Sequence, residues 1–177
     1  DVEHFIVRCQ LFAESGGSTA DSHRVIGIEL ANAAGEKYDA RLRITDTEVE
    51  LWDYHDGGGT TPAQVGSTFT YTRGHKLDIL FALGGTVAMT ATAWVRTAAT
   101  YLDLSDRNFD VAGVISGAID NRGAATADNR VFIGQMVGDA GGAITTQVYL
   151  ACFSKEELAV PYTWDTSETK IDPGAAS

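Results

Sequence analysis

The sequence predicts an all-β protein, an antiparallel sandwich of two sheets that closes with one short helical turn. Segments in which apolar and polar residues alternate recur along the chain, as in strands with one buried face. Gly and Thr are abundant while Lys is scarce, which favours strands and turns over long helices. At 177 residues the chain fits one domain, whose core needs no metal or disulfide to fold.

The first half of the chain reads as a meander of hairpins. The strand expected at residues 38–45 shows the clearest pattern, because apolar residues at even positions alternate with polar ones at odd positions. Such alternation is typical of an antiparallel strand with one face in water. The stretch Asp56-Gly57-Gly58-Gly59 predicts a loop. By the same criteria we expect strands at residues 3–12, 24–31 and 48–53.

The second half continues the pattern less clearly. We expect strands at residues 66–72, 76–83, 86–97, 109–115, 131–137 and 145–153, with Gly84-Gly85 as a hairpin turn. The whole chain then holds roughly ten to twelve strands. Ser154 and Glu157 have the spacing of a capping box, which predicts the helical turn. We expect residues 1–160 to form the sandwich and residues 161–177 to form a tail that docks on it or on a partner.

The charge of the chain excludes some classes of partner. The formal net charge is −11. Nucleic-acid-binding proteins present a basic face and anionic membranes attract basic segments, so the charge argues against both. No apolar run approaches the roughly 18 residues of a transmembrane helix. The acidity instead fits a soluble particle surface, or loops that hold a cation.

The order of segments near the C-terminal end points to a family. Val131-Phe132-Ile133-Gly134, a Gly-rich loop, Val148-Tyr149-Leu150-Ala151 and Ser154-Lys155-Glu156-Glu157-Leu158 follow one another. This order resembles the close of concanavalin A-like (laminin-G-like) lectin and glucanase domains, and the hairpin at Gly84-Gly85 looks like their central hairpin. The resemblance implies a jelly roll, as found in carbohydrate-binding proteins, polysaccharide-degrading enzymes and phage virion surface or tail proteins.

The resemblance also implies that the first strand pairs with the last. Cys9 and Cys152 would then be neighbours, which makes a disulfide between them a candidate. The alternative is that both cysteines are small, buried apolar side chains.

The segment from Glu48 to Asp53 invites an enzymatic interpretation, because it resembles the E-x-D-x-x-E strand of retaining glucanases with this fold. Retaining hydrolysis needs two carboxylates about 5 Å apart across the sugar. Here Glu48, Glu50 and Asp53 stand where that family has Glu, Asp and Glu, and strict alternation puts Asp53 on the core side of its strand. The alternative is a solvated strand face, with Asp53 at the start of a turn.

The candidate ligand-binding residues are side chains that could stack on sugar rings. Trp52 and Tyr54 lie on the polar side of their strand with His55 next to them, and Trp94 lies on the non-core side of its own strand. Tyr71 and Tyr101 complete the set. An aromatic ring on a wet strand face suits a sugar platform or an interface anchor, and packing under a loop is the alternative.

Calcium is the one cofactor that the sequence suggests. Asp103, Asp106 and Asp110 lie in expected loops and supply the hard oxygen ligands that Ca²⁺ prefers, although Asp is also common in ordinary turns. The histidines are scattered, and the sequence has no nucleophile elbow, phosphate-binding loop or dinucleotide fingerprint.

These observations leave three interpretations. The first is a non-enzymatic β-sandwich on a virion surface or outside the cell, a decoration, fibre or tail component. It would contact other virion or surface proteins, form a homo-oligomer and could bind glycans. The second is a carbohydrate-binding module of a larger secreted protein. The third is a glycan hydrolase that uses Glu48, Glu50 and Asp53. A large exposed apolar patch would favour assembly, and a surface lined by Trp52, Tyr54 and His55 would favour sugar binding.

Overall fold

The computed structural model describes residues 3–15, 22–31, 37–56, 62–85, 89–99, 113–119, 130–137 and 144–157. Ten strands lie in these ranges. They are β1 (Glu3–Ser15), β2 (Ser22–Ala31), β3 (Lys37–Ile44), β4 (Glu48–Asp56), β5 (Ala63–Thr70), β6 (Lys76–Gly85), β7 (Met89–Ala98), β8 (Gly113–Ile119), β9 (Arg130–Val137) and β10 (Thr145–Glu157).

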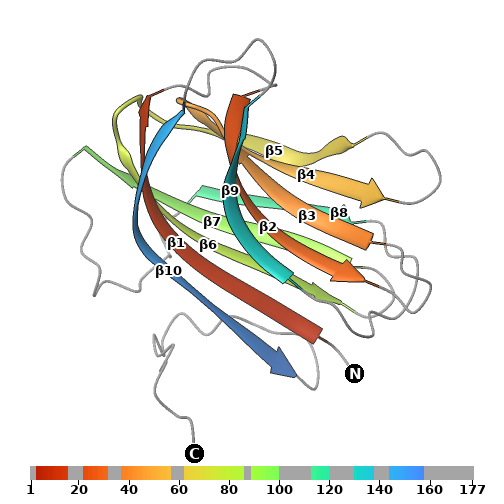
Figure 1. Ribbon diagram of the computed structural model, residues 1–177. Coiled ribbons are helices and arrows are strands. Elements are labelled where there is room, and N and C mark those ends of the chain that lie inside the picture. Colours follow the sequence, from red (N-terminus) through yellow and green to blue (C-terminus); the bar gives the residue numbers. More distant parts are fainter. Residues whose placement is uncertain are drawn as a thin grey trace, which may run out of the picture.

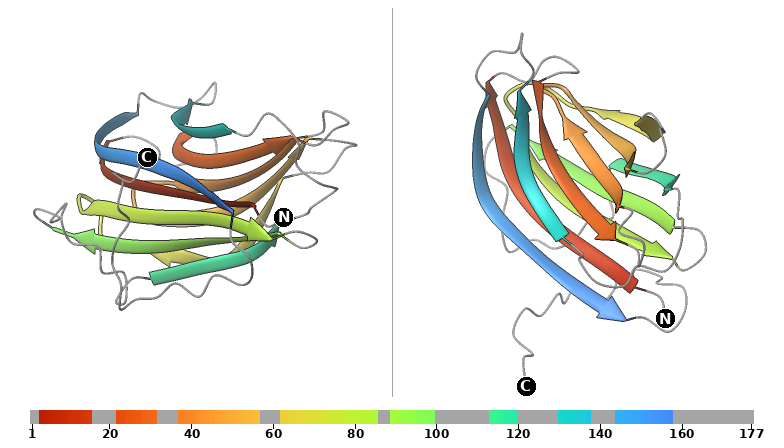
Figure 2. Two further views of the ribbon diagram at one scale, coloured as in Figure 1. Left: turned by 90° about the horizontal axis from the view of Figure 1, so that it is seen from below. Right: turned by 45° about the vertical axis from the view of Figure 1, so that its right-hand side comes forward.

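The strands form two five-stranded sheets that pack face to face (Figure 1; Figure 2). Sheet I has the order β10-β1-β6-β7-β8, and sheet II has the order β5-β4-β3-β2-β9. All neighbouring strands within each sheet pair antiparallel. The predicted all-β sandwich is therefore confirmed, and its arrangement is consistent with a jelly roll. The described ranges contain no helix long and apolar enough to cross a membrane.

The core lies between the two sheets and follows the alternation of the sequence. Among the described side chains of β3, β6 and β7, the apolar residues at alternate positions are buried: Ala40, Leu42, Ile44, Leu77, Ile79, Phe81, Leu83, Met89, Ala91, Ala93 and Val95. Removing apolar surface from water stabilises the fold by about 25 cal/mol per Å². This core fixes which side of each strand faces outward, and so positions the surface side chains.

The end of β10 corrects one prediction. Ser154 and Glu157 do not cap a helical turn but continue the strand, where they pair with Ile6 and Glu3 of β1. Pairing with β1 gives the backbone of this segment a continuous ladder of hydrogen bonds, which a single helical turn cannot match. Long-range pairing therefore overrides the local capping signal.

Several strand boundaries in the second half of the chain also differ from the prediction, most clearly at β6 and β8. Gly84 pairs with Thr90, and Gly85 pairs with Glu3, so both glycines belong to β6 instead of a two-residue turn. Pairing on both sides of β6 extends this strand beyond the point at which its apolar pattern ends. The strand predicted at residues 109–115 lies further along the chain, at Gly113–Ile119.

The two sheets contact each other on both sides of the sandwich. On one side β5 approaches β8 so closely that a Cβ on Gly66, which has a φ of +73°, would lie 2.4 Å from the Ser116 carbonyl oxygen. On the other side Arg24 of β2 reaches β10, where its Nε donates to Thr146 Oγ1 (2.7 Å) and its Nη2 donates to the Thr145 carbonyl (3.0 Å). These contacts link sheet I to sheet II beyond the apolar core.

Tyr71 completes the polar corner around Arg24. Its hydroxyl donates to the Thr45 carbonyl (2.6 Å), and Asp46 accepts from Arg24 Nη1 (3.3 Å) and from Arg73. Burial raises the pKa of Tyr71 well above its ordinary value of 10.0, the charge of Arg24 opposes this rise, and that of Asp46 adds to it. Tyr71 is thus a buried donor within the sandwich, which favours the alternative that its ring packs in the protein over a contact with sugar.

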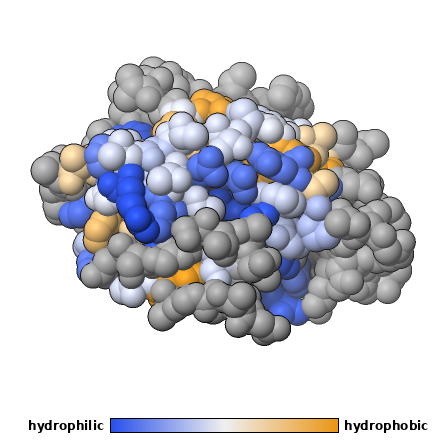
Figure 3. Space-filling view, turned by 90° about the horizontal axis from the view of Figure 1, so that it is seen from above, coloured by the Kyte–Doolittle hydropathy of each residue, from blue (hydrophilic) through white to orange (hydrophobic). Residues whose placement is uncertain are grey.

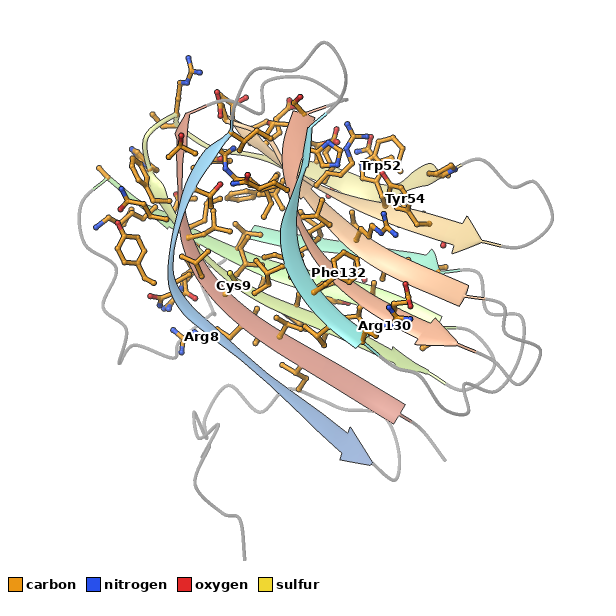
Figure 4. All side chains as sticks on the ribbon, viewed as in Figure 1. Arg8, Cys9, Trp52, Tyr54, Arg130 and Phe132 are labelled. Carbon is orange, nitrogen blue, oxygen red and sulfur yellow. The ribbon has the colours of Figure 1, made fainter. Side chains whose placement is uncertain are left out.

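The pairing of the first strand with the last is confirmed by β1 and β10. Cys9 stands opposite Ala151 and Cys152 opposite Arg8, so the two cysteines occupy adjacent positions of the ladder and do not face each other. Successive strand positions face opposite sides of a sheet, as Figure 4 shows for Arg8 and Cys9. Cys9 is a buried thiol of the core. The disulfide stays a prediction, and this register disfavours it.

Candidate functional site

The outer face of sheet II carries an aromatic pair. Trp52 and Tyr54 occupy alternate positions of β4, opposite in parity to the buried Val49 and Leu51, so they point away from the core. Their ring centroids are 6.3 Å apart, and their planes are tilted by 49°. Both side chains are half-buried, and Figure 4 shows them next to each other at β4. The structure therefore brings two of the predicted ligand-binding residues together on one surface.

Two arginines of β3 lie over these rings. The guanidinium carbon of Arg43 is 4.2 Å from the ring centroid of Trp52, and that of Arg41 is 4.2 Å from the centroid of Tyr54. Arg41 also lies 5.2 Å from the centroid of Phe132 in β9. A cation over an aromatic ring is attracted by the ring quadrupole, which contributes about 0.5–1 kcal/mol at exposed sites. These stacks restrict the orientation of both rings before any ligand arrives, which lowers the entropic cost of binding.

Carboxylates complete the arrangement. Glu50 Oε2 accepts a hydrogen bond from Trp52 Nε1 at 3.0 Å and lies 3.8 Å from Arg43 Nε. Further along the face, Arg130 Nε lies 3.3 Å from Glu29 Oε1. Trp52 is therefore held both through its ring and through its N–H group, and Arg43 and Arg130 each have a carboxylate beside them.

A glycine opens the centre of the same face. The strand register aligns Phe132, Gly27, Arg41 and Trp52 in one row across β9, β2, β3 and β4. The Phe132 ring lies over the backbone of Gly27, where a Cβ would stand 2.1 Å from Phe132 Cζ. Figure 4 shows Phe132 and Arg130 following each other along β9. The missing side chain at Gly27 is what lets the Phe132 ring settle beside Arg41.

The three carboxylates of the glucanase-like segment are divided between two sides of sheet II. Glu50 faces Arg43 on the outer side, whereas Asp53 faces the fully buried Ala40 on the core side. Glu48 shares the outer parity of Glu50 and stands opposite Thr70. Retaining hydrolysis needs a carboxylate pair that opens to one cleft. Glu50 and Asp53 do not form such a pair.

Trp94 belongs to a different surface. It lies in β7 on the outer face of sheet I, where it packs with Ala82 against the buried side chains of Ile6 and Leu80. The thickness of the sandwich, about 10 Å between packed sheets, separates this face from Trp52. The structure therefore does not join Trp94 to the aromatic pair.

Close to Trp94 lies a buried ionic cluster that the sequence patterns do not single out. The fully buried carboxylate of Asp78 accepts from Arg8 Nε (3.1 Å) and Nη2 (2.9 Å), and also from Arg96. Such two-pronged, charge-assisted hydrogen bonds are among the stronger polar contacts in proteins. The cluster joins β1, β6 and β7 and has a structural role.

Several predicted site residues cannot be placed. Tyr101, the calcium candidates Asp103, Asp106 and Asp110, and the tail at residues 161–177 lie outside the described residues. His55 belongs to β4 through its backbone, but its side chain is also outside them. Within the described ranges, no group of His, Cys, Asp or Glu side chains could hold a metal ion. Calcium therefore stays a prediction.

Sequence reasoning missed three residues of the aromatic face: Arg41, Arg43 and Phe132. The alternation of β3 does put both arginines on the polar side, but a solvated strand face explains such charges equally well. Their partners come from β4 and β9, and only the register of sheet II identifies them.

Comparison with known proteins adds one weak structural likeness. No protein-family model and no curated protein sequence matches the chain. The chain is similar to a crystal structure of the family 7 alginate lyase A1-II′ in complex with a substrate, with 13% identity and a TM-score of 0.49. The match covers 89% of this chain but 63% of the lyase chain. A likeness of this size carries no conclusion about activity or ligand.

Proposed function

We propose that this protein is a non-enzymatic β-sandwich that binds a glycan on the outer face of sheet II. The observation that carries the proposal is the half-buried Trp52–Tyr54 pair, held in place by Arg41, Arg43 and Glu50. One face of a pyranose ring presents mainly C–H groups and packs on an aromatic ring, while its hydroxyl groups bond to polar side chains around it. This face offers both kinds of contact.

We propose a binding role without catalysis because of the contacts of Glu50, the carboxylate next to the Trp52 ring. Glu50 accepts a hydrogen bond from Trp52 and faces Arg43, so its carboxylate orients these two side chains. A general acid must instead carry a proton and direct it at the leaving group. A carboxylate whose contacts orient the rings suits a binding surface.

A pair of tryptophan variants tests the proposal. We expect Trp52→Ala to weaken binding to a glycan array and to soluble polysaccharides by about tenfold, because one stacking surface is removed. Trp94→Ala is the matched control, since Trp94 is also a half-buried tryptophan on an outer sheet face. Thermal unfolding must show that both variants are folded. Equal binding by the two variants, or no glycan binding by the wild-type protein, would contradict the proposal.

The wider role we propose is that of a surface component, on a virion or outside the cell, that assembles into a homo-oligomer. Exposed apolar side chains on edge strands support assembly: Val114 in β8, Ile133 in β9, and Val148 and Tyr149 in β10. Exposed apolar side chains near the edge of a sheet favour contact with another chain. In Figure 3 hydrophilic residues cross the middle of the visible side, and hydrophobic residues form small separate patches, so edges are better candidates than that side. The alternative context is a binding module within a larger secreted protein.

The native mass in solution, with and without EDTA, distinguishes these contexts. A defined oligomer is the expected result for an assembly component, and a monomer would favour the binding module. A mass that changes with EDTA would support the predicted calcium, which the described residues cannot test.

A further inference from the structure

We infer that the aromatic face of sheet II takes a neutral, soluble glycan chain and discriminates against polyanionic ones. This inference rests on the proposed function and names the ligand class of the same site. It is carried by two observations, the pairing of the arginines on this face and the tilt between the two rings.

The arginines beside the rings already have partners within the protein. Arg43 is stacked on Trp52 and lies beside Glu50, and its side chain is only 8% exposed. Arg41 lies against the rings of Tyr54 and Phe132. An anionic ligand would have to draw these guanidinium groups away from their partners, so binding its charge offers little net gain.

The charge around the site also opposes an anionic ligand. The net charge of the chain is −11, and a field of one sign repels ligands of the same sign. On the outer side of sheet II, Arg43 stands opposite Glu50 and Arg130 stands opposite Glu29, and Glu48 adds a third carboxylate to the same side of β4. A neutral sugar meets no such repulsion, and its hydroxyl groups can bond to both kinds of side chain.

The geometry of the rings narrows the ligand further. Trp52 and Tyr54 are tilted by 49°, so a flat ribbon cannot lie against both rings at once. Two successive sugar units can meet both rings if the chain twists between them. The site therefore fits a single soluble chain that can twist, in preference to the flat surface of a crystalline polysaccharide.

The test uses probes that share a backbone and differ in charge. The probes are highly methyl-esterified pectin with its de-esterified form, hydroxyethyl cellulose with carboxymethyl cellulose, and an array of neutral glycans beside their sialylated, sulfated and uronic-acid counterparts. In every pair of which at least one member binds, we expect the neutral polysaccharide to bind at least about tenfold more tightly than the charged one. We also expect its affinity to change little between low and high salt, because screening acts on charged contacts.

Glu50→Gln tests the role of the Arg43–Glu50 pair independently, because it removes the carboxylate beside Arg43 without changing the size of the side chain. We expect this variant to gain affinity for the acidic probes by several-fold. Glu48→Gln is the matched control, since it removes the same charge from the same side of β4 but stands opposite Thr70. Equal gains in the two variants would overturn the role of the Arg43–Glu50 pair.

The outcomes separate failure of the inference from failure of the proposed function. Tighter binding of the acidic probes, weakened by salt and lost in Trp52→Ala, would overturn the inference and leave the glycan site in place. Tighter binding to microcrystalline cellulose than to soluble chains would overturn the argument that the tilt of the two rings selects a soluble, twisted chain. If no probe binds, or if Trp52→Ala and Trp94→Ala behave alike, both the inference and the proposed function are wrong.

Discussion

The outer faces of the two sheets use the same kinds of side chain under different degrees of burial. On sheet I, Arg8 and Arg96 enclose Asp78, and the side chains are 6%, 9% and 0% exposed. On sheet II, Arg43 approaches Glu50 at 3.8 Å with 8% and 16% of the side chains exposed, next to half-buried rings. Both faces thus combine arginine, a carboxylate and a tryptophan.

The difference in burial determines what each face can do. A carboxylate out of contact with water depends on its partners for all of its solvation, so the sheet I cluster stabilises one arrangement of strands. On sheet II the arginine is buried to a similar degree, but Glu50 keeps some contact with water, and the pair orients the half-buried Trp52 ring. The same chemistry is therefore structural on one face and suited to binding on the other.

The largest effect should come from Asp78→Ala. Removing this carboxylate leaves two arginines buried without it, and we expect a loss of about 3–5 kcal/mol in the free energy of unfolding. Glu50→Ala, the equivalent change on sheet II, should cost less, about 1–2 kcal/mol, because it removes one hydrogen bond from a carboxylate that keeps some contact with water. Denaturant unfolding of both variants measures the contrast. Similar losses would mean that burial does not distinguish the two faces.

A smaller loss of stability should follow from a substitution at Gly27 of sheet II. Gly27→Ala would drive a methyl group into the Phe132 ring, which we expect to cost about 1–3 kcal/mol of stability and to weaken glycan binding by displacing Arg41. Gly134→Ala is the control on the same side of the sheet, because a Cβ there has no atom within 4 Å. It should change stability by less than about 0.5 kcal/mol. Equal behaviour of the two variants would show that Phe132 does not depend on Gly27.

The smallest change in stability should come from Tyr71→Phe. Tyr71 belongs to neither outer face, so its variant shows how much a buried polar contact inside the sandwich contributes. The folded protein holds the Tyr71 proton more tightly than the unfolded chain does, because the pKa is raised above 10.0. This contribution to stability is fully present below pH 10.0 and is lost as the pH rises above that value. Tyr71→Phe should cost about 1 kcal/mol near neutral pH, through the lost hydrogen bond to Thr45, and should flatten the alkaline decline.

Unfolding temperatures measured across the alkaline range check this expectation. Tyr54→Phe is the control, because Tyr54 lies on the outer face of sheet II and not in the corner. An unchanged alkaline decline in Tyr71→Phe would contradict the prediction.

Local patterns of the chain predicted the side of each strand that faces the core. The alternation within β3 assigned Leu42 inward and Arg43 outward, and the alternation within β4 put Trp52 on the outer side, because successive strand residues face opposite sides. The same patterns misjudged Ser154, where a capping signal competed with the ladder to β1. Sequence reasoning fails there because the partner strand lies at the other end of the chain.

The sequence by itself determined the all-β class, the inward residues of most strands and the aromatic candidates Trp52 and Tyr54. Tertiary structure alone decided that these rings share a face with Arg41 and Phe132, and that Trp94 lies on the other sheet. The reason is that alternation specifies a side within each strand, whereas the neighbours on that side depend on strand order and register. Those are set by the packing of the whole sandwich.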